Sequence, residues 1–198
     1  MRYDYPLNLH FKVIALAPQA WVRDAAGREV LYVKQKLFKL KEKIRVFADA
    51  SQSRLLHEIN ADRVLDLSPR FTFTAADGAV VGAVKRRGAR SLWRSTYELT
   101  ATDGSALLLE EENPWIKLLD GILGAVPILG AFTGFFLHPT YAVRELPSGR
   151  GALRVKKHRS FFESRFSIEV DAGPPAEAAE TAVLLGILTM VLLERERG

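Results

Sequence analysis

Basic side chains gather in three segments of this chain and are its clearest signal for chemistry. Residues 28–45 hold seven Lys or Arg against two Glu, residues 84–94 hold five without an acid, and residues 150–165 hold six against one Glu. Each segment has a local charge of +5, and so does the whole chain. Arg and Lys bind phosphate oxygens, so such segregation predicts an anionic ligand. The alternative is a set of ordinary solvated strand faces.

The candidate ligands for phosphate or a lipid headgroup come from the second and third segments. They are Lys85, Arg86, Arg87, Arg90, Arg94, Lys156, Lys157 and Arg159. If the strands that carry them are neighbours, their wet faces merge into one positive field. Aromatic residues interleave with these cations, which keeps nucleic acid open as a weaker partner. Trp93 and Tyr97 share the apolar side of one predicted strand, however, and this favours core packing for both.

Motifs for catalysis or metal binding are missing from the sequence. The chain has no Cys, and its four His show no metal-ligand spacing. No G-x-S-x-G nucleophile elbow occurs. Glu110, Glu111 and Glu112 form a carboxylate cluster without a calcium loop, so they are expected at a solvated strand end. These observations predict a non-catalytic protein without cofactor or metal.

An uncharged stretch from Gly121 to Val143 is nominally long enough to cross a bilayer. Gly and Pro residues interrupt it, with Pro127 placed to begin a second helix, so two short helices are expected. Three interpretations remain open for this hairpin insertion at 114–139: packing on its own domain, dipping into a membrane, or spanning one. Its candidate membrane or partner contacts are Trp115, Ile122, Leu123, Ile128, Leu129, Phe132, Phe135 and Phe136.

A second apolar stretch, 181–193, predicts a buried helix. It is too short to span a membrane as a helix, and acids at its start oppose the positive end of the helix dipole. A helix that is apolar on every face needs protein on every side. Most of the remaining chain alternates with period two, and Asp77-Gly78 and Asp103-Gly104 indicate tight hairpins.

These two patterns together predict a mainly β fold. We expect a closed antiparallel barrel of about twelve strands around a central C-terminal helix at 176–195. Because no linker or break in composition divides the sequence, residues 1–198 are predicted to form a single domain. The apolar helical hairpin at 114–139 is then an insertion between two strands.

The same residues carry a family resemblance. The segment 31–43, the turn Asp77-Gly78 with the following 82–88, the segment 91–97, and the closing apolar helix resemble the LURP-one-related family, which belongs with the tubby-like and phospholipid scramblase folds. The resemblance covers roughly 28–195 and implies a twelve-stranded barrel around a central helix. It also implies that the protein binds phosphoinositide headgroups or transfers lipids. The acylated cysteines and the calcium segment of scramblases are missing from this sequence, so the resemblance does not extend to calcium-activated scrambling.

The resulting functional prediction is a non-enzymatic module that binds anionic phospholipid through a basic strand face. The first residues lack the apolar run of a secretory signal, so a cytoplasmic protein, peripheral at a membrane, is expected. The alternative is a protein-interaction or structural domain that uses the 114–139 hairpin as a dimer or partner surface. Nucleic-acid binding and scramblase-like lipid transfer are weaker alternatives.

Overall fold

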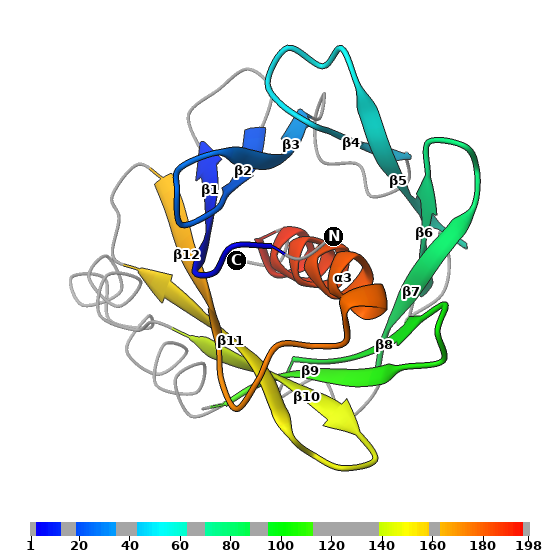
Figure 1. Cartoon of the computed structure of the whole chain (residues 1–198), viewed down its shortest axis with the longest axis vertical. Helices are drawn as coiled ribbons and strands as arrows, with labels where there is room; N and C mark the ends of the chain where they lie inside the picture. Colours follow the sequence, from blue (N-terminus) through cyan, green and yellow to red (C-terminus); the bar gives the residue numbers. More distant parts are fainter. Residues whose placement is uncertain are drawn as a thin grey trace, which may run out of the picture.

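The computed structural model describes residues 3–12, 19–34, 43–62, 70–87, 95–112, 139–158 and 163–195. Within them lie twelve strands and the helix α3 (Figure 1). The strands are β1 (Leu7–Lys12), β2 (Gln19–Arg23), β3 (Glu29–Lys34), β4 (Ile44–Phe47), β5 (Leu55–Ala61), β6 (Arg70–Ala75), β7 (Val80–Arg86), β8 (Thr96–Ala101), β9 (Ala106–Glu111), β10 (Thr140–Leu146), β11 (Gly151–His158) and β12 (Glu163–Val170). The helix α3 follows them at Glu177–Arg195.

The strands form one closed antiparallel barrel. Each strand pairs with its neighbours in the sequence, and β1 pairs with β12 to close the ring. Period-two alternation explains the closure, because inward apolar residues such as Phe73 and Leu99 are fully or almost fully buried. The predicted turns at Gly78 and Gly104 are confirmed, and both glycines have the positive φ that these turns require.

The helix α3 fills the barrel, as the apolar composition of its sequence predicts (Figure 1). Its residues 182–192 are all buried, and they form one core with inward side chains of the surrounding strands. The helix lies closest to β7 and β8. At this contact Gly82 of β7 and Gly186 of α3 allow the strands and the helix to approach closely. A Cβ added at Gly82 would lie too close to Ala182 and Thr100, and one added at Gly186 would lie too close to Leu99. The predicted fold class, a mainly β barrel around a C-terminal helix, is confirmed.

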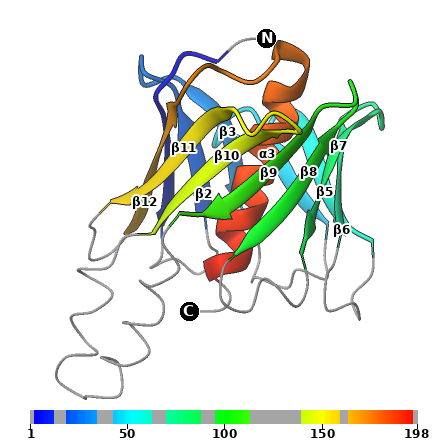
Figure 2. The same ribbon diagram turned by 90° about the horizontal axis from the view of Figure 1, so that it is seen from below.

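The barrel has two chemically different ends, which we call the amino rim and the carboxyl rim after the end of α3 found there. Tyr3 marks the amino rim, where its Oη lies 3.3 Å from Thr181 Oγ1. Tyr97 marks the carboxyl rim, where its Oη donates to Glu194 Oε1 over 2.7 Å. Short described turns join strands at the amino rim. Figure 2 shows the two ends of α3 at opposite ends of the barrel, and by sequence the strand ends at the carboxyl rim border six segments that lie outside the described residues.

Candidate phosphate-binding surface

Cross-strand ion pairs neutralise much of the basic charge on the outer wall. Arg87 pairs with Glu98, Arg144 with Glu110, and Lys156 with Glu169 over 2.6 Å. In each pair the acid belongs to the strand next to the base. Charge counted along the chain therefore overstates the positive field of a sheet, where the nearest side chains come from other strands.

The three predicted ligands Lys85, Arg86 and Arg87, at the end of β7 and directly after it, separate into two sets. Lys85 and Arg87 are exposed on the outer wall, whereas Arg86 is only 8% exposed and alternates inward with Val84. Arg86 lies opposite Tyr97 in the register of β7 and β8. The prediction that Arg86 lies on the wet face is therefore wrong, because two residues in sequence on a strand point to opposite faces.

The two predicted ligands on β11 separate in the same way. Lys156 lies on the outer wall, and its ammonium holds the pKa of Glu169 below the usual range through their hydrogen bond. Lys157 lies on the same face as the inward Val155 and is half-buried. The condition under which the β7 and β11 clusters would merge, that their strands are neighbours, is not met. Strands β8, β9 and β10 lie between them, so the two clusters are about 19 Å apart along the wall.

Other predicted site residues lie outside the described residues, and the structure makes no statement about them. They are Arg90, Arg94 and Arg159 among the phosphate ligands, and all eight hairpin contacts, namely Trp115, Ile122, Leu123, Ile128, Leu129, Phe132, Phe135 and Phe136. The hairpin insertion at 114–139 is outside them as well, except for Pro139.

The structure adds two cations that sequence reasoning missed as ligands. Lys12 ends β1 and Lys34 ends β3, and both register with Gln19 of the intervening strand. Both lysines are exposed at the carboxyl rim, as is Lys85, and within the described part of the chain none of the three forms an ion pair. A signal was available in the sequence, since each lysine follows an apolar residue that the alternation predicts to point inward; in the strand register, Lys12 lies opposite Glu163 and Lys85 opposite Glu98.

Beneath these lysines, the inside of the carboxyl rim is polar. Arg86, Tyr97, Glu111 and Tyr141 face the interior there, and Glu194 reaches them from α3. Burial and the nearby Glu194 carboxylate raise the pKa of both tyrosines far above the ordinary value. The expectation of a solvated carboxylate cluster fails for Glu111, which is fully buried, while Glu110 and Glu112 pair with arginines outside.

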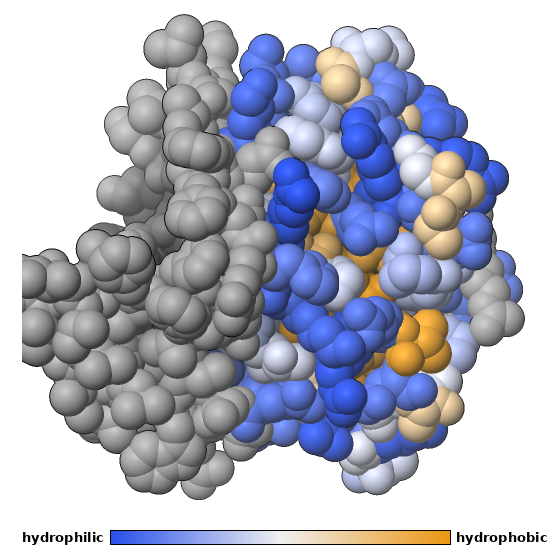
Figure 3. Space-filling view, turned by 90° about the vertical axis from the view of Figure 1, so that its left-hand side faces the viewer, coloured by the Kyte–Doolittle hydropathy of each residue, from blue (hydrophilic) through white to orange (hydrophobic). Residues whose placement is uncertain are grey.

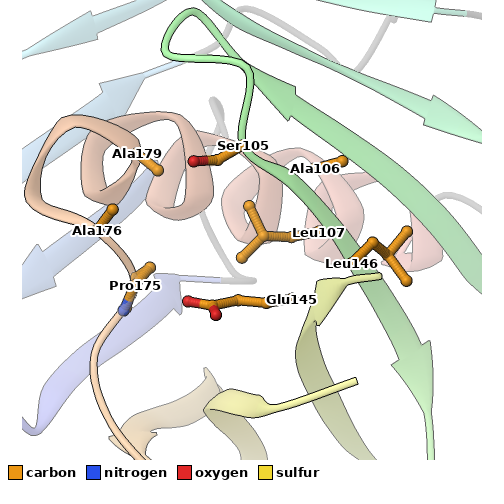
Figure 4. Close-up of a pocket in the computed structure, with 8 residues that line it drawn as sticks. All are labelled: Ser105, Ala106, Leu107, Glu145, Leu146, Pro175, Ala176 and Ala179. Atoms are coloured by element: carbon orange, nitrogen blue, oxygen red, sulfur yellow. The ribbon is translucent and has the colours of Figure 1, made fainter. Parts of the chain in front are cut away.

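A small pocket of about 180 Å³ lies at the opposite, amino rim. It opens between β9, β10 and the start of α3, and its lining residues are Ser105, Ala106, Leu107, Glu145, Leu146, Pro175, Ala176 and Ala179 (Figure 4). Glu145, its charged lining residue, already forms an ion pair with Arg150. An acidic and apolar lining of this kind does not suit phosphate.

Comparisons with known proteins leave the family undecided. No family model matches the chain. Over 122 residues, or 61% of its length, the chain is 28% identical to a protein named transcription regulator srbA precursor from Aspergillus fumigatus, and it spans 12% of that protein. The chain is also similar to a protein from Arabidopsis thaliana whose structure was solved by X-ray crystallography. The match covers 96% of this chain and 93% of the Arabidopsis chain, with a TM-score of 0.49 and 16% sequence identity.

The chain is a twelve-stranded β-barrel protein. This conclusion rests on the strand pairing, because a likeness at that TM-score and identity carries no argument. In the described ranges, no group of three or more His, Asp or Glu is placed to hold a metal ion. No helix in the described part has the length and apolar character needed to cross a bilayer.

Proposed function

We propose that this barrel is a non-catalytic module of the LURP-one-related, tubby-like group, and that its carboxyl rim binds anionic phospholipid. The observation that carries the proposal is the distribution of charge. The six segments that join strands at the carboxyl rim are 13–18, 35–42, 63–69, 88–94, 113–138 and 159–162. By sequence they contain eight Lys or Arg and three Asp or Glu. The rest of the chain holds 20 of each, so the whole net charge of +5 belongs to these segments.

Their composition also suits the boundary between water and lipid. These six segments contain two of the three Trp and six of the eleven Phe in the chain. Aromatic and basic residues together are typical of protein surfaces that meet lipid headgroups. Lys12, Lys34 and Lys85 add three exposed charges at the strand ends that flank these segments. A protein partner at the 114–139 hairpin remains the alternative, and the experiment below distinguishes the two.

Co-sedimentation with vesicles tests the proposal. Wild-type protein should sediment with phosphatidylcholine vesicles that contain a phosphoinositide, and less so as salt is raised, because exposed charges are screened beyond about 8 Å at physiological ionic strength. Neutralising the three rim lysines in K12Q/K34Q/K85Q should weaken binding by on the order of a hundredfold, at about 1 kcal/mol per charge.

A matched variant controls for total charge. Arg28, Arg54 and Arg150 lie in turns at the amino rim, and R28Q/R54Q/R150Q removes the same number of charges from the opposite end. This control should bind the vesicles like wild type. Equal loss in both triple variants, or equal recovery of wild type with neutral and anionic vesicles, would refute lipid binding at the carboxyl rim. A concentration-dependent dimer without vesicle binding would favour the protein-partner alternative.

A further inference from the structure

Exposed hydrophobic side chains gather at the amino rim of the barrel. Among the residues that the structure describes, the exposed large hydrophobic side chains are those of Val80, Leu146 and Val170. Val80 begins β7, Leu146 ends β10 and Val170 ends β12, so each borders a turn at the amino rim. Figure 3 shows one side of the barrel, and its described surface is mainly hydrophilic, with hydrophobic residues visible between the polar ones. Apolar side chains gathered at one end of a barrel indicate a surface that meets another molecule.

The pocket at this rim has room for one side chain of a partner. Six of its eight lining residues are apolar, and one of them is the exposed Leu146 (Figure 4). Its volume of about 180 Å³ is similar to that of an apolar cavity of about 150 Å³ that holds benzene. Pockets for drug-sized ligands begin at roughly 300 Å³. The pocket therefore fits a single apolar side chain better than a lipid or a cofactor.

Contacts on both sides of the pocket hold its walls in place. Arg150 Nε donates to Glu145 Oε2 over 2.9 Å, and Arg150 Nη2 donates to Pro174 O over 3.4 Å. The guanidinium thus joins the end of β10 to the segment that leads into α3. On the β9 side, Asp103 Oδ1 accepts a hydrogen bond from the Ser105 N–H over 2.9 Å. A preformed pocket of this kind lowers the ordering cost of binding a partner.

The amino rim around the pocket carries net negative charge. Its described segments are residues 3–6, 24–28, 48–54, 76–79, 102–105, 147–150 and 171–176. They contain six Asp and three Arg, with no Lys or Glu, and the strand ends that border them add the ion pair of Arg23 with Glu29. Glu177 and Glu180 in the first turn of α3 bring the net charge of this rim to −5, and they outweigh the roughly +0.5 of the helix dipole there. A partner with Lys or Arg on either side of an apolar residue is therefore complementary to the rim and the pocket together.

We infer that this pocket is a docking site for a basic segment of a partner protein, with one apolar side chain in the pocket and Lys or Arg residues against the acidic rim. The inference goes beyond the proposed function and does not rest on it, because the two surfaces lie at opposite ends of α3 (Figure 2). The negative charge of the amino rim also disfavours nucleic acid and lipid phosphate as its ligands.

Peptide binding, followed by fluorescence anisotropy, tests the apolar anchor. The probes are the labelled peptides Lys-Lys-Lys-Leu-Lys-Lys-Lys and Lys-Lys-Lys-Ala-Lys-Lys-Lys. Wild type should bind the leucine peptide about tenfold more tightly than the alanine peptide, which is the effect of burying about two more methylene groups. An acidic peptide, Glu-Glu-Glu-Leu-Glu-Glu-Glu, should not bind.

Two exposed alanines at the start of α3 provide a matched pair of variants for the pocket. Ala176 lines the pocket, whereas Ala178 does not. A176L should fill the pocket and remove the preference for the leucine peptide. A178L adds the same side chain outside the pocket and should keep the preference.

Two glutamates provide a matched pair for the charge. Glu145 at the pocket and Glu29 at the start of β3 have side chains that are 27% and 26% exposed, and each forms an ion pair with an arginine. E145Q should weaken binding of both lysine peptides by up to about fivefold, the effect of one exposed ion pair. E29Q removes the same charge away from the pocket, so binding should stay within about twofold of wild type because solvent ions screen it.

The inference is overturned if wild type binds the leucine and alanine peptides equally, or if A176L keeps the preference while its thermal unfolding matches wild type. Equal losses in E145Q and E29Q would also overturn it, because the peptides would then follow the charge of the whole rim. Amide NMR signals of wild type give a test without variants. Those of Ala106 and Ala176 should shift with the leucine peptide, and shifts confined to the carboxyl rim would refute docking at the pocket. K12Q/K34Q/K85Q should bind the peptide like wild type, so failure of vesicle binding refutes the proposed function alone.

Discussion

Tyr97 Oη donates a hydrogen bond to Glu194 Oε1 over 2.7 Å, and this contact joins the barrel wall to the last turn of α3. The two residues are 97 positions apart in the sequence. Tyr97 is fully buried, whereas Glu194 lies at the half-buried end of the helix. The contact therefore fixes how far α3 extends toward the carboxyl rim.

Removing this hydrogen bond should destabilise the barrel. Y97F keeps the ring but deletes the donor to a carboxylate, and we expect a loss of about 2 kcal/mol in the free energy of unfolding. Urea denaturation of Y97F, E194Q and the double variant would measure the coupling. Additive effects of the two single substitutions would contradict a direct contact.

Arg86 and Lys85 should respond differently to neutralisation, although they are adjacent in sequence. Arg86 is buried near Tyr97, whose hydroxyl donates to Glu194, so R86Q removes a charge from a polar site inside the barrel and should lower the free energy of unfolding by on the order of 3 kcal/mol. K85Q removes an exposed charge, and we expect the free energy of unfolding to stay within about 0.5 kcal/mol of wild type. Thermal or urea unfolding of both variants checks this contrast. Equal free energies of unfolding for R86Q and K85Q would contradict the burial of Arg86.

The close approach of α3 to β7 predicts that Gly82 cannot be enlarged. A Cβ at Gly82 would lie 2.8 Å from both Thr100 O and Ala182 Cβ, so backbone has to move in G82A, and we expect a loss of about 3 kcal/mol. In G186A the obstacle is the flexible end of Leu99, and Ala also favours helix, so the loss should be smaller. Differential scanning calorimetry would rank the two variants. A more stable G82A would contradict the helix position.

His57 should make the fold less stable at acidic pH. Burial lowers the pKa of His57 below its ordinary value of 6.5, so the folded protein keeps this ring neutral at pH values where the unfolded chain protonates it. Unfolding then takes up a proton, and the free energy of unfolding falls as the pH drops below about 6.5. Urea titrations at several pH values should show a shallower loss for H57Q than for wild type. An equal loss in H57Q and wild type would contradict the burial that lowers the pKa of His57.

Alternation and helix composition were enough to predict the barrel. The runs at Phe71–Ala75 and Phe166–Val170, together with the uncharged 181–193, specify which side chains point inward and what fills the interior. Both patterns are local, and together they predict a closed barrel, because a helix that is apolar on every face has to be enclosed by protein. The same alternation also predicts that Tyr97 is buried, and the structure confirms it.

The charged surface was harder to predict for a physical reason. Lys85, Arg86 and Arg87 form one cluster in the sequence, but a strand places Arg86 on the opposite face from its two neighbours. Glu98 belongs to β8 and neutralises Arg87 across the sheet, which no count along β7 reveals. Lys12 and Lys34 lie far apart in the sequence and only two strands apart in the barrel. Surface charge depends on which strands are neighbours, whereas burial depends mainly on alternation.

The order of elements along the chain has a consequence for biosynthesis. The ribosome releases α3 after all twelve strands, yet α3 supplies the middle of the core. Until α3 emerges, no helix covers the apolar faces of the strands, and β1 and β12 remain as unpaired edges if they have not yet met. Nascent chains of this protein should therefore depend on chaperones until α3 has left the ribosome, and ribosomes stalled before residue 177 should display aggregation-prone, protease-sensitive intermediates.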